Sequence, residues 1–315
     1  MCGLYGFLNY GQPIKNLSLI TNALAKESAV RGTDAVGIAV NKNGRIHICK
    51  EGKPAYLVNF KHNDSIKALI GHTRHSTQGS EKHNYNNHPF YGKAGTTSFA
   101  LAHNGVLGND EILRETYNLK NTKIQTDSYI AVQLIEHKSE LNMESLKFMA
   151  EEITGSFSFN ILDENDNVYL VKGDSPLSIL HFPQYKLYVY ASTDEILWRA
   201  LIKTFLFEDI KAYKYEEIYI NEGEILKICN NGKIKSGTFK YTDYACLGMY
   251  DWYKFGYNCE INPHEEYIEM LREMAEYNGY GSETVDELLE GGFTIDEIEE
   301  YIYSSDAHRY AIEGR

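Results

Sequence analysis

The 315-residue sequence lacks the long apolar runs of a membrane protein. No stretch comes near the roughly 20 apolar residues that span a bilayer. A secretory signal is also missing, because polar residues and proline break up the first apolar stretch between Asn9 and Pro13. These absences argue against a membrane role and make the cytoplasm the expected location.

Clustered cysteines and an excess of basic charge are missing as well. Five cysteines at irregular spacing argue against a disulfide framework or a zinc knuckle, and we expect neither a metal nor a cofactor. The net charge of −13 disfavours bare nucleic acid as a partner. The cysteines are Cys2, Cys49, Cys229, Cys246 and Cys259.

The charge is unevenly distributed along the chain. From Tyr241 onward, four Lys and Arg stand against eighteen Asp and Glu, a charge of −14, so residues 1–240 carry about +1 by difference. The same 75 residues hold eleven of the 25 tyrosines. We therefore predict two domains, a main domain at 1–240 and an acidic, tyrosine-rich appendage at 241–315.

Apolar periodicity predicts strand-rich blocks that alternate with helices in the main domain. Expected strands cover 3–9, 35–40, 45–49, 68–73, 98–103, 156–162, 167–171, 187–190 and the strand-rich segment 216–228. Expected helices cover 17–29, 110–117, 127–137, 143–153 and 193–204. This alternation indicates two sheets with helices packed outside them.

The appendage has helix signals of its own. Two Thr-x-x-Glu capping boxes begin at Thr284 and Thr294, and the glycine pair 291–292 ends the first of the two helices. Another helix is expected at about 265–277. The pattern predicts a helical hairpin preceded by a third helix.

Cys2 is a candidate nucleophile, because a cysteine after the initiator Met can become the N-terminus of the mature chain. Its freed α-amine, with a reference pKa of about 7.7–8.0, could then take the proton from its own thiol near neutral pH. Gly3 and Gly6 let backbone or substrate approach the sulfur closely. Taken alone, a second-position cysteine is more often an accident or a buried filler.

Five further polar stretches follow Cys2 in a fixed order. They are Arg31-Gly32-x-Asp34-x-x-Gly37, the run Gly71 to Gly79 (GHTRHSTQG), Asn87-His88-Pro89, His103-Asn104-Gly105 and Thr126-Asp127-Ser128. Behind an initial Cys-Gly, this series resembles the glutaminase domain of class II glutamine amidotransferases, the N-terminal-nucleophile amidohydrolases. The resemblance covers roughly residues 2–200.

These residues suit the release of ammonia from glutamine. Cys2 can attack the amide carbon and form a γ-glutamyl thioester that water then opens. The Asn104 side chain and the next backbone N–H, that of Gly105, are suitable donors to the oxyanion. Glutamine is a zwitterion, so its α-carboxylate needs an arginine and its α-ammonium a carboxylate. The resemblance assigns these two roles to Arg74 and Asp127.

The resemblance also places Thr77 and His88 in motifs that line the substrate pocket, and Arg31 in a motif that braces the loop beside the nucleophile. Each residue has an ordinary alternative, since Asn-Gly is usually a turn and an aspartate before a helix is usually its N-cap. The histidines suggest a metal site, but His72 and His75, three apart on a strand, point to opposite faces and could not readily share an ion.

The resemblance implies an α+β fold, the four-layer αββα sandwich of N-terminal-nucleophile hydrolases, with a small helical C-terminal appendage. The 75-residue tail is too short for a synthase domain, so the predicted partners are glutamine and either a separate acceptor enzyme or a second copy of this chain. Two alternatives stay open. One is an N-terminal-cysteine amidohydrolase acting on a γ-glutamyl compound or peptide, and the other is a non-catalytic glutamine-binding regulator.

Overall fold

The computed structural model divides the chain into two compact units, Met1–Tyr244 and Ala245–Arg315. The assignment of residues 1–240 and 241–315 to two functional domains remains a prediction. Contacts within the chain define the two units, but they do not test what each unit does. The structure describes residues 2–212, 214–241, 280–281, 283–293 and the single positions 268, 271, 272, 275, 298 and 301.

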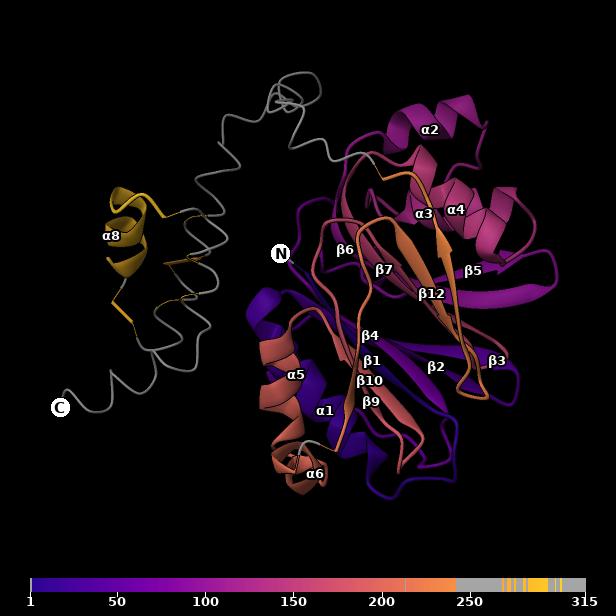
Figure 1. Cartoon of the computed structure of the whole chain (residues 1–315). Coiled ribbons are helices and arrows are strands. Elements are labelled where there is room, and N and C mark those ends of the chain that lie inside the picture. Colours follow the sequence, from indigo (N-terminus) through magenta and orange to yellow (C-terminus); the bar gives the residue numbers. More distant parts are fainter. Residues whose placement is uncertain are drawn as a thin grey trace. The chain divides into compact units, whose positions relative to one another are not determined.

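The first sheet contains seven antiparallel strands in the order β11-β9-β10-β1-β4-β2-β3 (Figure 1). Their bounds are β1 Gly3–Asn9, β2 Ala35–Lys42, β3 Arg45–Glu51, β4 Ala68–Arg74, β9 Ser178–Phe182, β10 Leu187–Ala191 and β11 Glu216–Ile218. The N-terminal strand β1 occupies the centre, where Tyr5 pairs with Ala191 of β10 on one side and with Gly71 of β4 on the other.

The second sheet contains six antiparallel strands in the order β13-β12-β8-β7-β6-β5. Their bounds are β5 Phe90–Ala94, β6 Thr97–Leu107, β7 Gly155–Asp163, β8 Val168–Lys172, β12 Glu224–Ile228 and β13 Ile234–Thr238. The pairing of β6 with β7 runs from Phe99 opposite Asp163 to Leu107 opposite Gly155. This long ladder fixes the position of Asn104 and Gly105 within β6.

Helices cover the outer face of each sheet (Figure 1). The apolar faces of α1 (Leu17–Glu27), α5 (Asp194–Leu201) and α6 (Phe207–Lys211) share one core with the first sheet. Those of α2 (Asp110–Thr116), α3 (Tyr129–His137) and α4 (Met143–Glu152) share another with the second sheet. Short 3-10 helices lie at Ser28–Arg31 (η1), Ala55–Leu57 (η2) and Asn84–Asn86 (η3).

A third apolar core fills the space between the two sheets. Successive side chains of a strand point to opposite faces of the sheet. Phe7 of β1 therefore faces the helices, whereas Leu8 faces the other sheet and packs in this third core. The buried side chain of Asn160 also lies between the sheets and donates to the Gly71 carbonyl at 3.2 Å. Helix, sheet, sheet and helix form four layers, so the predicted α+β αββα sandwich is confirmed.

The structure corrects the strand-rich segment 216–228. It breaks into β11 and β12, which belong to different sheets, and Gly223 at φ +78° lies in the turn between them. The sequence reading missed β5, β9, β13 and α6, which have only five residues each. The side chains of β13 are mostly exposed, so this edge strand carries no apolar alternation to detect.

Within the second unit, the structure describes α8 at Thr284–Glu290. The predicted capping box at Thr284 is wrong, because Glu283 precedes the helix and no side chain caps it. Gly291 ends the helix, as expected. The second capping box, at Thr294, and most of the predicted helix 265–277 lie outside the described residues.

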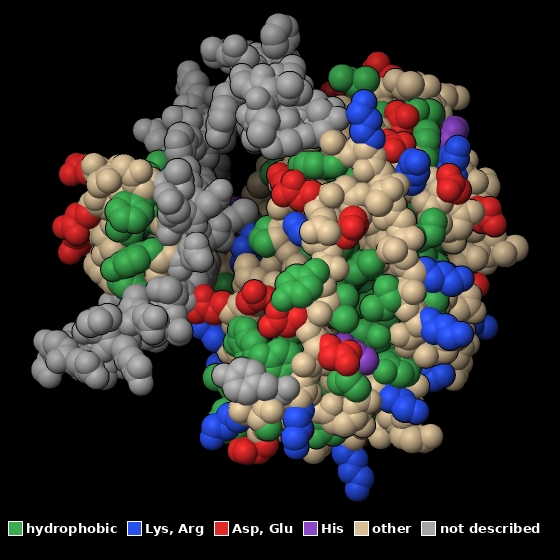
Figure 2. Space-filling model, viewed as in Figure 1, with side chains coloured by type: hydrophobic (Ala, Val, Ile, Leu, Met, Phe, Trp, Pro, Cys, Tyr) green, Lys and Arg blue, Asp and Glu red, His purple; other side chains and the backbone are tan. Residues whose placement is uncertain are grey.

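Among the described residues, no helix is long and apolar enough to cross a membrane. On the face of the first unit shown in Figure 2, acidic and basic side chains are interspersed. That distribution agrees with the near-zero charge of residues 1–240 and leaves the acidic surplus to the tail.

Candidate active site

Cys2 lies at the start of the central strand of the first sheet. Its sulfur accepts a hydrogen bond from the His75 backbone N–H at 3.4 Å. The next residue, Gly3, pairs with Thr73 of β4, and a Cβ at Gly3 would lie 2.6 Å from the Thr73 hydroxyl. Glycine therefore lets β1 and β4 approach closely and brings the sulfur to the end of β4.

Burial raises the pKa of the Cys2 thiol. The N–H of His75 and the charge of Arg74 act in the opposite direction, while the carboxylate of Asp127 raises this pKa further. A thiol in such surroundings is mostly protonated near neutral pH, so it needs a base before it can attack.

The stretch Arg31-Gly32-x-Asp34 forms a support for the nucleophile and for the end of β4. Arg31 is buried on η1, and its Nε donates to the carbonyl of the cysteine at 2.9 Å. A Cβ at Gly32 would lie 2.4 Å from the Arg74 carbonyl carbon. Asp34 accepts from the Ser76 N–H at 2.6 Å. The predicted bracing role of Arg31 fits this geometry.

Arg74 ends β4 with a buried guanidinium. Its Nη1 donates to the Asn87 side chain at 2.7 Å, and its Nη2 donates to the carbonyls of Gln78 and Gly79 at 2.7 and 2.6 Å. All these acceptors are neutral. Among the described residues Arg74 forms no ion pair, so its charge remains available to an anion.

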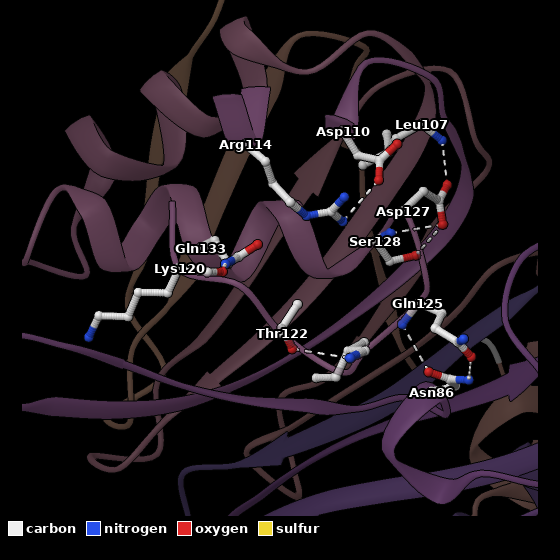
Figure 3. A network of polar contacts seen from close by, with 11 residues as sticks. Asn86, Leu107, Asp110, Arg114, Lys120, Thr122, Gln125, Asp127, Ser128 and Gln133 are labelled. Atoms are coloured by element: carbon white, nitrogen blue, oxygen red, sulfur yellow. Dashed lines mark hydrogen bonds and ion pairs between the residues drawn. The ribbon is translucent and has the colours of Figure 1, made fainter. Parts of the chain in front are cut away.

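Asp127 lies just before α3, with its carboxylate buried (Figure 3). One oxygen accepts from the Leu107 N–H at 2.6 Å and the other from the Ser128 N–H at 2.8 Å. Burial raises the pKa of Asp127, while these two hydrogen bonds and the charge of Arg74 lower it. α3 begins at Tyr129 without a side-chain cap, so the ordinary N-cap role does not apply to Asp127.

Cys2, Arg74 and Asp127 converge although they lie on β1, on β4 and before α3. The charges of Arg74 and Asp127 both act on the pKa of the Cys2 thiol. Arg74 in turn feels both partners, and Asp127 feels Arg74. A nucleophile, a cation and an anion therefore share one site.

Asn104 is fully buried on β6. Within the described part of the chain, neither atom of its carboxamide has a hydrogen-bond partner. Gly105 follows at φ +132°, and a Cβ there would lie 2.0 Å from the Ser156 carbonyl oxygen, so only glycine fits. Buried amides are nearly always bonded, and an unpaired one beside a special glycine is what a ligand-binding donor requires.

His88 is buried, with its ring centroid 4.1 Å from that of His72. Neither of its ring nitrogens has a partner within the described residues, and burial holds its pKa well below the ordinary value. His72 Nε2 lies 2.9 Å from the His103 carbonyl and joins the two sheets. Among the described residues, no cluster of His, Cys, Asp and Glu could hold a metal ion.

Thr77 is exposed on the loop after β4. Sequence reasoning assigned no role to the asparagine pair Asn86-Asn87, whose side chains hold this loop in place. Asn86 and Gln125 exchange two hydrogen bonds of 3.0 Å, which join the loop to the segment that leads to Asp127 (Figure 3). The only signal was the Asn-Asn pair before His88-Pro89.

Comparisons with known proteins agree with this geometry. A family model described as a glutamine amidotransferase domain matches residues 72–199. Glutamine–fructose-6-phosphate aminotransferase (isomerizing) of Listeria innocua is 34% identical over 187 residues, which cover 57% of this chain and 30% of that protein. The enzyme of the same name from Bacteroides thetaiotaomicron is 28% identical over 305 residues, or 92% of this chain and 43% of that protein.

Among solved structures, glutamine phosphoribosylpyrophosphate amidotransferase from B. subtilis matches with a TM-score of 0.61 at 20% identity. The match covers 87% of this chain and 58% of that chain. The chain spans less than half the length of the curated relatives named above. It carries a class II glutamine amidotransferase domain with the N-terminal-nucleophile fold.

Proposed function

We propose that this protein hydrolyses glutamine to glutamate and ammonia, with Cys2 as the nucleophile at the N-terminus of the mature chain. Asn104 and Gly105 stabilise the oxyanion. Arg74 binds the α-carboxylate and Asp127 the α-ammonium, while His88 and Thr77 line the pocket and Arg31 holds the nucleophile. The observation that supports this best is the convergence of Cys2, Arg74 and Asp127.

The reaction follows from these groups. The sulfur bonds to the amide carbon as the thiol proton passes to the α-amine of Cys2, and the carbonyl becomes an oxyanion beside Asn104 and Gly105. The carbon–nitrogen bond then breaks as the nitrogen takes that proton and leaves as ammonia. Water opens the thioester, giving glutamate and the free thiol. The α-amine is needed because no His side chain bonds to the Cys2 sulfur within the described residues.

The pair of opposite charges favours free glutamine over the other amides. Arg74 and Asp127 are both buried and oppositely charged, which matches an α-carboxylate and an α-ammonium. A γ-glutamyl peptide with a blocked α-group would leave one of them unpaired, which is costly in a buried site. A regulator that only binds glutamine would need neither the nucleophile nor the oxyanion donor.

The ammonia would pass to an acceptor enzyme on another polypeptide. The relatives' names pair glutamine with fructose 6-phosphate or with phosphoribosylpyrophosphate, so acceptors differ within this group. Residues 241–315, with a charge of −14 and eleven tyrosines, could supply the docking contact to the acceptor enzyme or to a second copy of the chain.

Ammonia release from glutamine by wild type, Cys2→Ala and Cys2→Ser tests the proposal, together with intact-mass spectrometry. We expect a mass that lacks Met1, release of ammonia by the wild type, and loss of release in the alanine variant with an unchanged unfolding temperature. Full activity of Cys2→Ala, or of protein that retains Met1, would contradict the mechanism.

A further inference from the structure

Lys50 is a second cation near Arg74, and its side chain is partly buried. It lies on the edge strand β3, opposite Gly37 in the pairing of β2 with β3. Its Nζ donates to the Asn87 backbone carbonyl at 2.6 Å and lies 5.3 Å from the centre of the Phe90 ring. The proposed mechanism so far assigns Lys50 no task.

Gly37 makes room for this arrangement. A Cβ at Gly37 would lie 2.1 Å from the His88 carbonyl oxygen and 3.1 Å from the Lys50 Cγ. Any larger residue would push the His88 backbone or the lysine stem off the sheet. Gly37, the last glycine of the stretch that begins at Arg31, therefore leaves the space through which Lys50 reaches the loop.

Asn87 joins the two cations. Its Nδ2 donates to the Glu81 carbonyl at 2.7 Å and to the Asn84 side chain at 3.0 Å. With both amide protons engaged there, its Oδ1 is turned toward Arg74, which donates to it at 2.7 Å. Lys50 holds the carbonyl of the same residue, so it fixes the part of the loop that orients the Arg74 guanidinium.

Burial lowers the pKa of Arg74 and the carboxylates of Asp34, Glu81 and Asp127 act in the opposite direction, but none of them forms an ion pair with it. Within the described part of the chain, neither Lys50 nor Arg74 forms an ion pair with a carboxylate. Burial lowers the pKa of Lys50 to about 8, and the charge of Arg74 contributes to the lowering. His88 also faces this lysine, and its own low pKa leaves it neutral at pH 7. A buried guanidinium and a partly buried ammonium, neither in direct contact with a carboxylate of the described residues, favour an anionic ligand.

We propose that Lys50 is a positioning residue of the carboxylate subsite, which holds Arg74 in place through Asn87 and adds a second positive charge toward the substrate's α-carboxylate. This inference rests on the proposed glutaminase function. It makes Lys50 a determinant of substrate capture, and it places none of the bond-breaking chemistry on this side chain.

The test compares Lys50→Met and Lys50→Arg with wild type in a glutaminase assay at pH 7. We expect Lys50→Met to raise KM by about tenfold to a hundredfold and to change kcat by less than about threefold. Lys50→Arg keeps the charge, so its KM should stay within about threefold of wild type. Lys53→Met is the matched control, because Lys53 is half exposed and pairs with Glu51 at 3.6 Å.

A pH series from 7 to 9.5 separates this role from simple packing. Lys50 loses its charge as the pH rises through its pKa, so the KM of wild type should rise above about pH 8. In Lys50→Arg the cation persists, and the rise should move to higher pH. The α-amine of glutamine and the groups on Cys2 titrate equally in both proteins, so they do not affect the comparison.

The outcomes distinguish the two proposals. An active wild type with the same KM in Lys50→Met, or with identical alkaline profiles in wild type and Lys50→Arg, overturns the role of Lys50 alone. A wild type that releases no ammonia from glutamine overturns the proposed function and this inference with it. If Lys50→Met does not fold, the comparison of wild type with Lys50→Arg still decides the question.

Discussion

Asn104 differs from the other buried asparagines of this chain. Asn86, Asn87 and Asn160 all donate hydrogen bonds from Nδ2 to carbonyl oxygens, as buried amides normally do. The Asn104 carboxamide has no partner among the described residues, although no part of the residue is exposed. A folded chain tolerates such a group where a ligand completes it, and the oxyanion of the proposed mechanism would be such a ligand.

Substitutions at Asn104 and Arg74 should therefore affect different kinetic constants. Asn104→Ala removes a donor that acts on the oxyanion, so kcat should fall by about 10²- to 10³-fold with little change in KM. Arg74→Ala and Asp127→Ala should chiefly raise KM, at a cost of about 2–5 kcal/mol for a desolvated charge. Steady-state kinetics with glutamine distinguishes the two classes, and an unchanged KM in both charge variants would refute the pocket assignment.

His103 makes the stability of the fold depend on pH. Burial lowers its pKa to about 4, whereas the unfolded chain takes up the proton near 6.5. The unfolded state therefore binds more protons between these two values, and the free energy of unfolding should fall with falling pH there, by up to about 1.4 kcal/mol per pH unit from this group. Urea unfolding at pH 7 and pH 5 measures it, and a His103→Gln variant should show a flatter dependence.

Among the strands and helices, periodicity predicted those that are long and either bury one face or are buried on all sides. β1, β4, β7 and α1 are of this kind, and the reading placed them within about two residues. The four elements it missed have five residues each, but length alone does not explain the misses, because β8 and β10 are equally short and were predicted. β13, for example, is mostly exposed and shows no apolar alternation. The sheet to which a strand belongs is set by contacts distant in sequence, which explains why β11 and β12 read as one segment.

Gly71 shows how tightly the central strands pack. A Cβ there would lie 2.1 Å from the Tyr5 ring, which is itself fully buried. Gly71→Ala should destabilise the protein by about 1–3 kcal/mol through overpacking. Thermal unfolding measures it. Gly44→Ala is the comparison, because that glycine has open space around it and its cost comes only from its positive φ.

For the molecule as a whole, the sequence indicated the groups that could react with or bind the substrate. It did not indicate the residues that hold those groups in place. The roles proposed for Cys2, Asn104, Arg74 and Asp127 can be reasoned from residue type and order. Lys50 and the asparagine pair of the loop act through neutral carbonyls and carboxamides, and such roles become visible only when the chain is folded. No period marks them in the sequence, and the motif Asn87-His88-Pro89 does not indicate the contact with Arg74.

A chain truncated after Tyr241 should fold and keep near-normal basal glutaminase activity. Both sheets and their helices lie within residues 3–238, and all the proposed site residues precede residue 128. If the tail serves docking, the truncated protein should also lose salt-sensitive capture of its partner. An insoluble or inactive product would show that the tail belongs to the main fold, and circular dichroism with the ammonia assay decides between these outcomes.

The central place of β1 has a consequence for the order of events during synthesis. Its two neighbours are β4, about 60 residues further on, and β10, which ends at Ala191. During synthesis β1 therefore cannot complete its pairing until nearly two hundred residues have followed it. A nascent chain stalled before β10 emerges should lack glutaminase activity although it already contains every residue of the proposed site.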